Sequence, residues 1–401
     1  MSPRACEYNC RAMEFPADPA PHAADPEYIF VDTADALQKM LDRLRGAHRI
    51  AVDIEADSLY HYYEKVCLIQ LSTDSDTFVL DPLALRDLSG LAPIMSSRAV
   101  EKVFHAAAYD LISLRRDYGF SIRRIFDTHV AAQLLGYEQL GLDALLESLL
   151  GVAHSKRRQR DDWSRRPLAP EQLRYAAMDT RYLLRLRHLL EERLRAAGRL
   201  EWAREEFRCA ADPPAHEKRF DPEGYRHIKG SRTLSPGELA ALRALYQLRD
   251  RYARALDLPP FKVIQNSVLL DLARRPPASP AELFQRPGIS FRIARNFAAE
   301  IHRTIRKARK ESVPARAPGA RILHQRPGTE ARELLERLKS WRSARARELG
   351  LHVGVLFPGN LLEELAVSRP RDLAALEAIE GMRRWRAREF GSEILRILHP
   401  E

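Results

Sequence analysis

The chain has 401 residues, of which 45% are hydrophobic and 30% are charged. This length exceeds one ordinary domain core and predicts about two or three domains. Its longest apolar runs, such as residues 66–71, are too short to span a membrane, and the N-terminus lacks the pattern of a secretory signal. The cysteines are too few for a disulfide framework: Cys6, Cys10, Cys67 and Cys209. We therefore expect a soluble, cytoplasmic protein.

The net charge of +10 is distributed unevenly along the chain. Residues 1–211 carry 29 Lys and Arg against 32 Asp and Glu, a net charge of −3. Residues 212–401 carry 36 against 23, a net charge of +13. A basic half of this kind favours contact with a polyanion such as nucleic acid, although solvated, Arg-rich helix faces give the same count.

The first half of the chain has the pattern of a mixed α/β domain. Residues 1–26 are rich in Pro and Ala and predict a disordered leader. Helical and β-type segments then alternate. Helices are predicted over 33–46 and 83–95, and strands around 50–55 and over 66–72, 77–80 and 100–104. This order predicts a mixed sheet with helices packed on it.

The predicted strand at 50–55 presents two acids on one face. Apolar residues alternate with Asp53 and Glu55, and alternate side chains of a strand point to opposite faces. Two buried acids side by side cost stability unless a cation lies between them. Because Asp-x-Glu is a short motif, a strand edge whose acids face water is the alternative.

A third acid follows a later strand. Asp110 comes shortly after the strand predicted at 100–104, and this junction would carry its carboxylate to the end of the sheet near Asp53. An acid at a helix start also complements the helix dipole, which is the structural alternative. Asp127 is interpreted as the N-cap of another helix.

The fourth acid lies on a helix predicted to start near Pro170, a residue suited to a first helical turn. Tyr175 and Asp179 are at positions i and i+4, so they share one face of this helix. Such a face can place a metal ligand beside a phenol that orients water. A half-buried Tyr with a surface Asp is the alternative.

Together, these acids indicate metal-dependent hydrolysis. Cleavage of a phosphodiester by two divalent ions requires a cluster of oxygen ligands and a positioned water. Asp53, Glu55, Asp110 and Asp179 supply carboxylates with no Cys and no obligatory His. That donor set favours Mg²⁺ or Mn²⁺ over zinc.

The order of the motifs resembles a known family. Asp-x-Glu on a strand, His-x₄-Asp after a later strand and Tyr-x₃-Asp on a helix resemble the Tyr-containing branch of the DEDD 3′→5′ exonucleases. The segment 162–168, with sequence DWSRRPL, narrows the resemblance to the ribonuclease D type. The resemblance covers about residues 28–205. It implies a ribonuclease-H-like sheet and removal of single nucleotides from a 3′ end.

The resemblance also implies a role for each matching residue. Asp53 would bridge the two metal ions, Glu55 and Asp179 would complete one site, and Asp110 would contribute to the other. Tyr175 would orient the attacking water, because a phenol with an ordinary pKa of about 10 is a poor base at neutral pH.

Other residues are candidates for contact with substrate. His105 matches the second motif, although a structural histidine is an equal alternative. Lys156 and Arg158 belong to a basic loop that suits phosphate contacts, with a solvated loop as the alternative. The aromatic run at 60–63 could stack on bases, although packing is the more economical use of at least two of these side chains.

The second half of the chain predicts a helical repeat. Ser235, followed by Pro and Glu, predicts a capped helix start. An offset of 93 residues aligns apolar positions without gaps, for example Leu245 with Leu338. Matched apolar positions at helical spacing predict two copies of one fold.

Each copy resembles the small HRDC domain found at the C-termini of RecQ-type helicases and of ribonuclease D. The second copy keeps fewer of the expected junction residues, so its assignment depends on the repeat. The predicted organisation is a leader 1–26, an exonuclease domain 27–211, a linker 212–232, a first HRDC domain 233–310, a basic linker 311–329 and a second HRDC-like domain 330–401.

We therefore expect a metal-dependent 3′→5′ exoribonuclease that trims structured RNA with a free 3′ end, such as tRNA precursors, and releases nucleoside 5′-monophosphates. Two alternatives stay open. The same chemistry could act on DNA, because the four acids do not select the sugar. The chain could also be an RNA-binding protein with an inactive nuclease domain, although retention of all four acids and Tyr175 argues against this.

Overall fold

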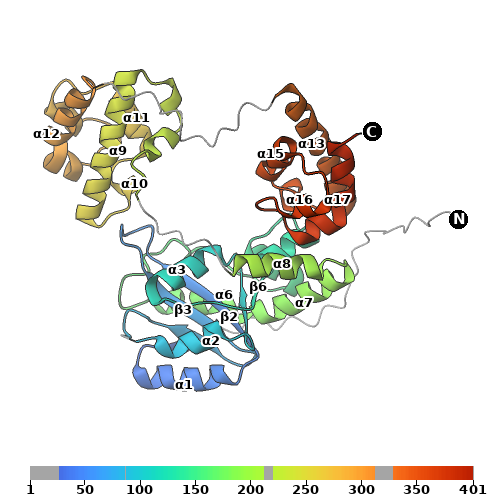
Figure 1. Cartoon of the computed structure of the whole chain (residues 1–401). Coiled ribbons are helices and arrows are strands. Elements are labelled where there is room, and N and C mark those ends of the chain that lie inside the picture. Colours follow the sequence, from blue (N-terminus) through green and yellow to red (C-terminus); the bar gives the residue numbers. More distant parts are fainter. Residues whose placement is uncertain (1–26, 86, 212–219, 312–327, 401) are drawn as a thin grey trace.

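The structure is a computed structural model, and it describes residues 27–85, 87–211, 220–311 and 328–400 (Figure 1). The predicted leader, which contains Cys6 and Cys10, lies outside the described residues. Within the described ranges, no helix combines the length and the apolar character that a membrane crossing requires.

The N-terminal part of the described chain, residues 27–211, is built on one six-stranded mixed sheet. Its strands are β1 (Ile29–Val31), β2 (Arg49–Ala56), β3 (Val66–Ser72), β4 (Thr77–Leu80), β5 (Glu101–Phe104) and β6 (Ile125–Asp127). They lie in the order β1-β4-β3-β2-β5-β6. β3 is antiparallel to both neighbours, and the other adjacent pairs are parallel. The predicted α/β class with a mixed sheet is confirmed.

Helices cover both faces of this sheet. They are α1 (Ala34–Arg45), η1 (Ser89–Leu91), α2 (Ala92–Ser96), α3 (Ala108–Tyr118), α4 (Thr128–Leu135), α5 (Leu142–Leu150), α6 (Pro170–Arg181), α7 (Leu183–Ala196) and α8 (Leu200–Ala210). α1, α2 and α3 share a core with the apolar side of β2, formed by Ile50, Val52 and Ile54. α6, α7 and α8 pack on the opposite face (Figure 1). The acids of β2 therefore face α6.

The single helix predicted over residues 83–95 is wrong in its first half. The chain there forms turns and the short η1 before α2 begins. Asp81 Oδ1 accepts a hydrogen bond from Leu83 N at 2.9 Å, and Asp87 Oδ1 accepts one from Ser89 N at 2.8 Å. Such local bonds from Asp side chains satisfy the backbone in turns and compete with helix formation.

Two helical repeats follow, described over residues 220–311 and 328–400. The first contains α9 (Pro236–Leu256), α10 (Pro260–Val263), α11 (Asn266–Arg274), η4 (Pro280–Phe284) and α12 (Phe291–Ala308). The second contains α13 (Thr329–Leu349), α14 (Val353–Leu356), α15 (Gly359–Ser368), α16 (Leu373–Glu377) and α17 (Arg384–Leu398). The offset of 93 carries both ends of α9 onto those of α13 and both ends of α10 onto those of α14. The two copies therefore share one fold.

The first repeat begins earlier than the sequence indicates. Residues 220–232, predicted to belong to a linker, contain η2 (Gly224–His227) and lead into η3 (Ser231–Thr233). Tyr225 is fully buried in the core of this repeat. The predicted cap is present, since Ser235 Oγ accepts from Glu238 N and Glu238 Oε2 accepts from Ser235 N at 2.8 Å. The charged surroundings of Tyr225 in the sequence hide its contribution to the core.

The second repeat shares a hydrophobic core with residues 27–211, where α17 packs on α8 (Figure 1). The Trp202 and Trp385 rings stack with centroids 4.4 Å apart and planes 15° apart. Glu205 of α8 accepts hydrogen bonds from the backbone N–H groups of Arg384 and Trp385 at 2.7 and 3.0 Å. A carboxylate at the N-terminus of α17 also complements its dipole. This repeat is thus anchored by packing and by polar contacts.

Candidate active site

β2 carries the first two acids. Asp53 pairs with Gln70 of β3 and Glu55 with Leu68, so both acids belong to the central antiparallel pair of the sheet. A β-bulge follows directly between Glu55 and Ala56. Because the pleat turns the neighbouring apolar residues to the α1 side, the two carboxylates project together toward α6.

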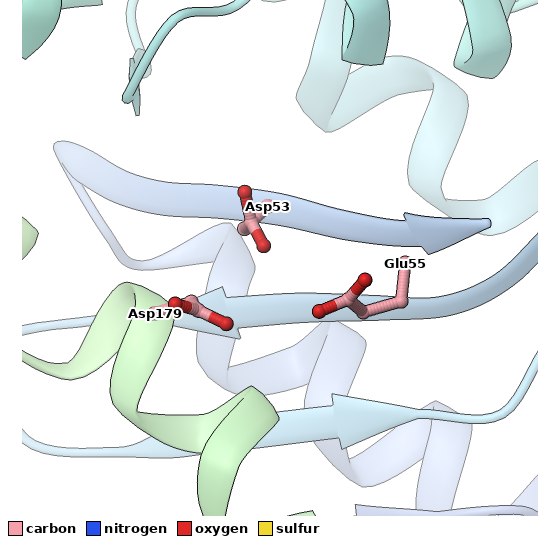
Figure 2. Close-up of side chains that lie close together, drawn as sticks. All are labelled: Asp53, Glu55 and Asp179. Atoms are coloured by element: carbon pink, nitrogen blue, oxygen red, sulfur yellow. The ribbon is translucent and has the colours of Figure 1, made fainter. Parts of the chain in front are cut away.

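α6 brings the third carboxylate to the same place. Asp179 lies near the C-terminal end of α6 and is 7% exposed. One carboxylate oxygen from each of Asp53, Glu55 and Asp179 lies within 4.8 Å of the other two. Figure 2 shows these three side chains converging, two from β2 and one from α6. We call these three residues the acid cluster.

Asp110 lies beside the acid cluster rather than in it. It is in the first turn of α3 and is 7% exposed. The turn before α3 is held by Asp127, whose two carboxylate oxygens accept from Ala106 N at 3.0 Å and Ala107 N at 2.9 Å. Asp127 also accepts from His129 N as the N-cap of α4, as predicted. One residue of β6 therefore fixes both the α4 start and the turn that presents Asp110.

Burial and mutual repulsion make these carboxyls resist ionisation. Burial raises the pKa of Asp53 well above its ordinary value, and the charges of Asp110 and Asp179 raise it further. Glu55 follows the same pattern, with burial first and then repulsion from Asp179. Burial also raises the pKa of Asp110, with Asp127 adding repulsion. Full ionisation of this group of carboxyls therefore costs free energy unless a cation offsets the charge.

The residues present fit a hard divalent cation. The acid cluster offers carboxylate oxygens within ligand-sharing distance. Asp179 Oδ2 is buried and has no hydrogen-bond partner among the described residues. In the same described ranges, no cationic side chain forms an ion pair with Asp53, Glu55 or Asp110. Several carboxylates held close together without a cationic partner are typical of a metal-binding site.

His154 is a site residue that the sequence reasoning missed. Its Nε2 lies 2.7 Å from Asp179 Oδ1, and the imidazole is 5% exposed. This contact lowers the pKa of Asp179, against the larger upward effect of burial. Nothing in the local sequence marks it, because His154 is 25 residues from Asp179 and lies in a loop next to the basic run at 156–160.

Tyr175 is held between His154 and Trp163. The His154 and Tyr175 ring centroids are 5.5 Å apart, and those of Trp163 and Tyr175 are 6.0 Å apart. Burial raises the pKa of the Tyr175 phenol, and Asp179 and Glu55 raise it further. The phenol therefore stays protonated at neutral pH and can donate a hydrogen bond but cannot act as a base.

The segment 162–168 is fastened to the sheet beneath Tyr175. Arg166 forms an ion pair with Asp81, with Nη2 to Oδ1 at 2.7 Å, and donates to the Cys67 carbonyl oxygen at 2.9 Å. Trp163 packs with Cys67 in a small core under α6. These contacts explain why the segment contains Trp163 and Arg166, and they fix the start of α6.

The predicted substrate contacts have partners within the protein. His105 Nδ1 lies 2.9 Å from Thr128 Oγ1, and burial lowers the pKa of His105 to about 4, which favours the structural alternative. Lys156 forms an ion pair with Asp143 at 2.6 Å, and Arg158 forms one with Asp161 at 3.1 Å.

The aromatic run at 60–63 contacts the first repeat. Asp257, at the end of α9, lies 2.8 Å from His61 Nδ1 and accepts from Tyr62 N at 3.0 Å. Tyr62 OH donates to Asp250 at 2.7 Å. Asp57 closes the base of this loop, since its Oδ1 accepts from Lys65 N at 2.8 Å. The loop that follows the acids of β2 is therefore attached to a helical domain nearly 200 residues away.

Comparisons with known proteins agree with this site. Residues 28–195 match the 3′-5′ exonuclease family, and residues 238–305 and 331–398 each match the HRDC domain. A ribonuclease D from Gluconacetobacter diazotrophicus is 31% identical over 94% of this chain and 94% of its own length. The chain belongs to the ribonuclease D family.

Structural comparison points to the same family. The Escherichia coli RNase D structure, described as an exoribonuclease involved in structured RNA processing, superposes with a TM-score of 0.69 and 26% identity over 93% of this chain and 99% of that one. The catalytic core of RRP6 from Trypanosoma brucei gives a TM-score of 0.64 and 29% identity over 70% of this chain and 79% of that one.

This ribonuclease D family member is a 3′→5′ exoribonuclease, a hydrolase that acts on RNA. The predicted resemblance and the ribonuclease-H-like fold are confirmed. Its exonuclease domain family depends on divalent metal ions, which agrees with the acid cluster.

Proposed function

We propose that this enzyme trims the 3′ ends of structured RNA, such as tRNA precursors, by two-metal hydrolysis with Mg²⁺ or Mn²⁺. The observation that carries the proposal is the acid cluster, whose carboxylates approach within 4.8 Å of one another in a site that is at least half-buried. Such repulsion is maintained in a folded protein when a cation offsets it. A cytoplasmic location, where such RNA is found, is part of the same proposal.

We assign each site residue a role in metal binding or in orienting water from its position in the site. Asp53 feels the charges of both Asp110 and Asp179 and would hold both ions. Glu55 and Asp179 would complete one site, and Asp110 would serve the other. When bound, the ions supply Lewis-acid activation of the phosphodiester and a more acidic water. Tyr175, kept protonated, would orient that water by accepting or donating a hydrogen bond. The product would be a nucleoside 5′-monophosphate.

We propose RNA rather than DNA as the substrate because these relatives, which match nearly the whole chain, are ribonucleases. The net charge of +13 on residues 212–401 supports binding of a large polyanion. Folded RNA with a free 3′ end offers both a polyanionic body and a terminus for the acid cluster.

A time course on end-labelled RNA and DNA of one sequence, with Mg²⁺ or Mn²⁺, tests the proposal. We expect RNA to shorten by single nucleotides from its 3′ end, and Asp53→Asn to lower the rate about 10³-fold or more because an electrostatic anchor of the transition state is lost. Asp42→Asn, on the exposed side of α1, is the matched control and should keep full activity. Faster loss of DNA would overturn the substrate, and metal-independent RNA binding without cleavage would leave an inactive nuclease.

A further inference from the structure

A second feature of the exonuclease part lies at the opposite end of the sheet from the acid cluster. A cavity of about 690 Å³ opens where β2, β5 and β6 begin, between them and helices α7 and α8. Arg49, at its edge, precedes Asp53 by four residues, which is about 13 Å along a strand. The cavity is therefore separate from the candidate active site.

Arginine dominates the lining of this cavity. Its exposed arginines come from the start of β2, from the segments just before β5 and β6, and from α8: Arg49, Arg98, Arg123, Arg124, Arg204 and Arg208. We call these six residues the arginine rim. The acidic lining residues are Glu101 and Glu191. The cavity therefore carries a clear excess of positive charge.

The two acids are already engaged by a seventh arginine. Arg187 of α7 is 4% exposed, and its Nε donates to Glu101 Oε2 at 2.7 Å. It also donates to Glu191. Arg49 lies 3.5 Å from the same Glu101 oxygen. In the described part of the chain, no carboxylate pairs with Arg98, Arg123 or Arg208, so the excess charge faces the opening.

One member of the arginine rim, Arg124, is held by backbone contacts. Arg124 donates to the carbonyl oxygens of Arg98 at 3.2 Å and Ala99 at 2.7 Å. From below, the buried Lys102 ammonium donates to Ser97 O at 2.7 Å and Val100 O at 2.8 Å. The turn 97–100 is thus fixed from two sides. Because its side chain is already ordered, Arg124 would lose less conformational entropy on binding an anion.

We propose that this cavity binds phosphate groups of the RNA body while the 3′ end of the same RNA occupies the active site. Arginine presents a planar fork that matches phosphate oxygens in pairs. The volume exceeds that needed for one inorganic phosphate and suits a stretch of backbone. The inference rests on the proposed function only in taking these phosphates to be those of the RNA substrate.

Binding measurements separate this site from catalysis. All variants are made in an Asp53→Asn background and titrated, with a metal chelator present, into a fluorescent RNA hairpin with a single-stranded 3′ tail and into the tail alone. Arg123→Ala with Arg208→Ala removes two unpaired members of the arginine rim. Arg185→Ala with Arg371→Ala is the matched control, since both are exposed and lie outside the cavity. Thermal unfolding confirms that each variant is folded.

We expect the cavity variant to bind the hairpin about tenfold more weakly than the control and to bind the tail equally well. The slope of log K against log salt should fall by about 1.8 for two lost duplex phosphate contacts. Arg123→Lys with Arg208→Lys should keep most of that slope because the charge is retained.

Equal hairpin binding and equal salt slopes for the cavity and control variants would overturn the proposal. The same variants are also titrated with inorganic phosphate and with a nucleoside monophosphate. If the cavity variant loses saturable binding of these small anions but still binds the hairpin normally, the cavity is a small-molecule site and the proposal is overturned. Weaker hairpin binding with no cleavage by the unsubstituted enzyme would preserve this inference while overturning the proposed function.

Discussion

At the scale of single residues, the acid cluster and the neighbouring Asp110 carry two energetic costs, burial and mutual repulsion, which a bound cation would offset. Burial disfavours the charged form of Asp53, Glu55 and Asp110, and each carboxylate repels the others. Their pKa values are all raised in the folded chain. A raised carboxyl pKa means that the folded state holds protons which the unfolded state releases.

The metal-free protein should therefore lose stability as pH rises. The loss begins near the ordinary carboxyl pKa of about 4, where the unfolded chain ionises first, and continues until the folded-state pKa values are passed. Each unit of pKa elevation costs about 1.4 kcal/mol of unfolding free energy. Thermal unfolding between weakly acidic and neutral pH measures this, with and without Mn²⁺.

Mn²⁺ should raise the unfolding temperature more at neutral pH than at acidic pH, since ionised carboxylates bind it. Without metal at neutral pH, Glu55→Gln should be at least as stable as the unsubstituted protein, because it removes one repelling charge. A Glu55→Gln protein that is less stable than its parent under these conditions would show that the burial and repulsion of the Glu55 charge do not destabilise the metal-free protein.

His154 should act on metal affinity through Asp179. Its hydrogen bond at 2.7 Å orients one carboxylate oxygen of the acid cluster. Loss of such a partner typically weakens metal binding about 10–100-fold. His154→Ala should raise the Mn²⁺ concentration that gives half-maximal cleavage by this amount and change the rate at saturating Mn²⁺ much less.

His188→Ala is the control for this measurement, because His188 is exposed on α7 and faces Glu192. An unchanged metal requirement in His154→Ala would contradict the positioning role.

The sequence predicts the four acids but not the residues that position them. Asp53, Glu55, Asp110 and Asp179 follow from motifs with fixed spacing, and the structure places all four in or beside one site. His154 could not be predicted, because its contact with Asp179 depends on how a loop crosses the C-terminal end of α6. Asp127 was predicted as a cap, and its second role in the turn before α3 appears only in three dimensions.

At the scale of elements, the loop between β2 and β3 links the active site to the first repeat. Asp257 has a φ of 47°, a left-handed conformation in which its carboxylate reaches the backbone of Tyr62 and Tyr63. Arg254 of the same helix donates to Tyr62 OH at 2.9 Å. His61 and Tyr62 of the aromatic run thus contact the first repeat, whereas the sequence predicted that at least two of these side chains pack in the following hairpin.

Asp257→Gly should release this loop without straining the chain. Glycine adopts the left-handed conformation freely, so the change removes only the carboxylate. We expect faster hydrogen exchange at the Tyr62 and Tyr63 amides and a loss of unfolding free energy of about 1–3 kcal/mol, because hydrogen bonds to the charged Asp257 carboxylate are lost.

Asp257→Asn is the conservative comparison, since it keeps an acceptor for both amides. It should protect them nearly as well as aspartate does. Unchanged exchange in Asp257→Gly would mean that the repeat does not hold the loop.

At the scale of the whole molecule, the second repeat is part of the exonuclease core. Gly136, at the end of α4, has a φ of +83°, and a Cβ there would lie 2.0 Å from the Gly350 carbonyl oxygen of the second repeat. Gly198 has a φ of +69° with nothing within 4 Å of such a Cβ. A substitution at Gly198 therefore tests backbone strain alone, whereas one at Gly136 tests strain together with a clash between domains.

Gly136→Ala should destabilise the protein by about 3 kcal/mol or more, because strain adds to a forced separation of the Trp202 and Trp385 surfaces. Gly198→Ala should cost only about 1–2 kcal/mol, the price of the left-handed conformation for alanine. Denaturant unfolding measures both. Equal losses in the two variants would show that the second repeat is not tightly docked.

The contact between the second repeat and α8 also uses some of the positive charge from which polyanion binding was predicted. The Arg383 Nε lies 3.0 Å and the Arg386 Nη1 3.1 Å from the Glu206 carboxylate of α8. Part of the +13 of residues 212–401 is thus used inside the molecule, and part of the basic surface comes from the first half, in the arginine rim. Net charge along a sequence cannot show this, because it counts charges without their partners.

The most direct test of the proposed two-metal site is the number of Mn²⁺ ions bound per chain. Calorimetric titration should be run at neutral pH in the presence of an RNA whose 3′-terminal linkage cannot be hydrolysed. We expect two ions for the unsubstituted enzyme and loss of at least one in Asp53→Asn, with Asp42→Asn unchanged. Absence of Mn²⁺ binding to the unsubstituted enzyme, or equal binding by Asp53→Asn, would contradict the assignment of the acid cluster as the metal site.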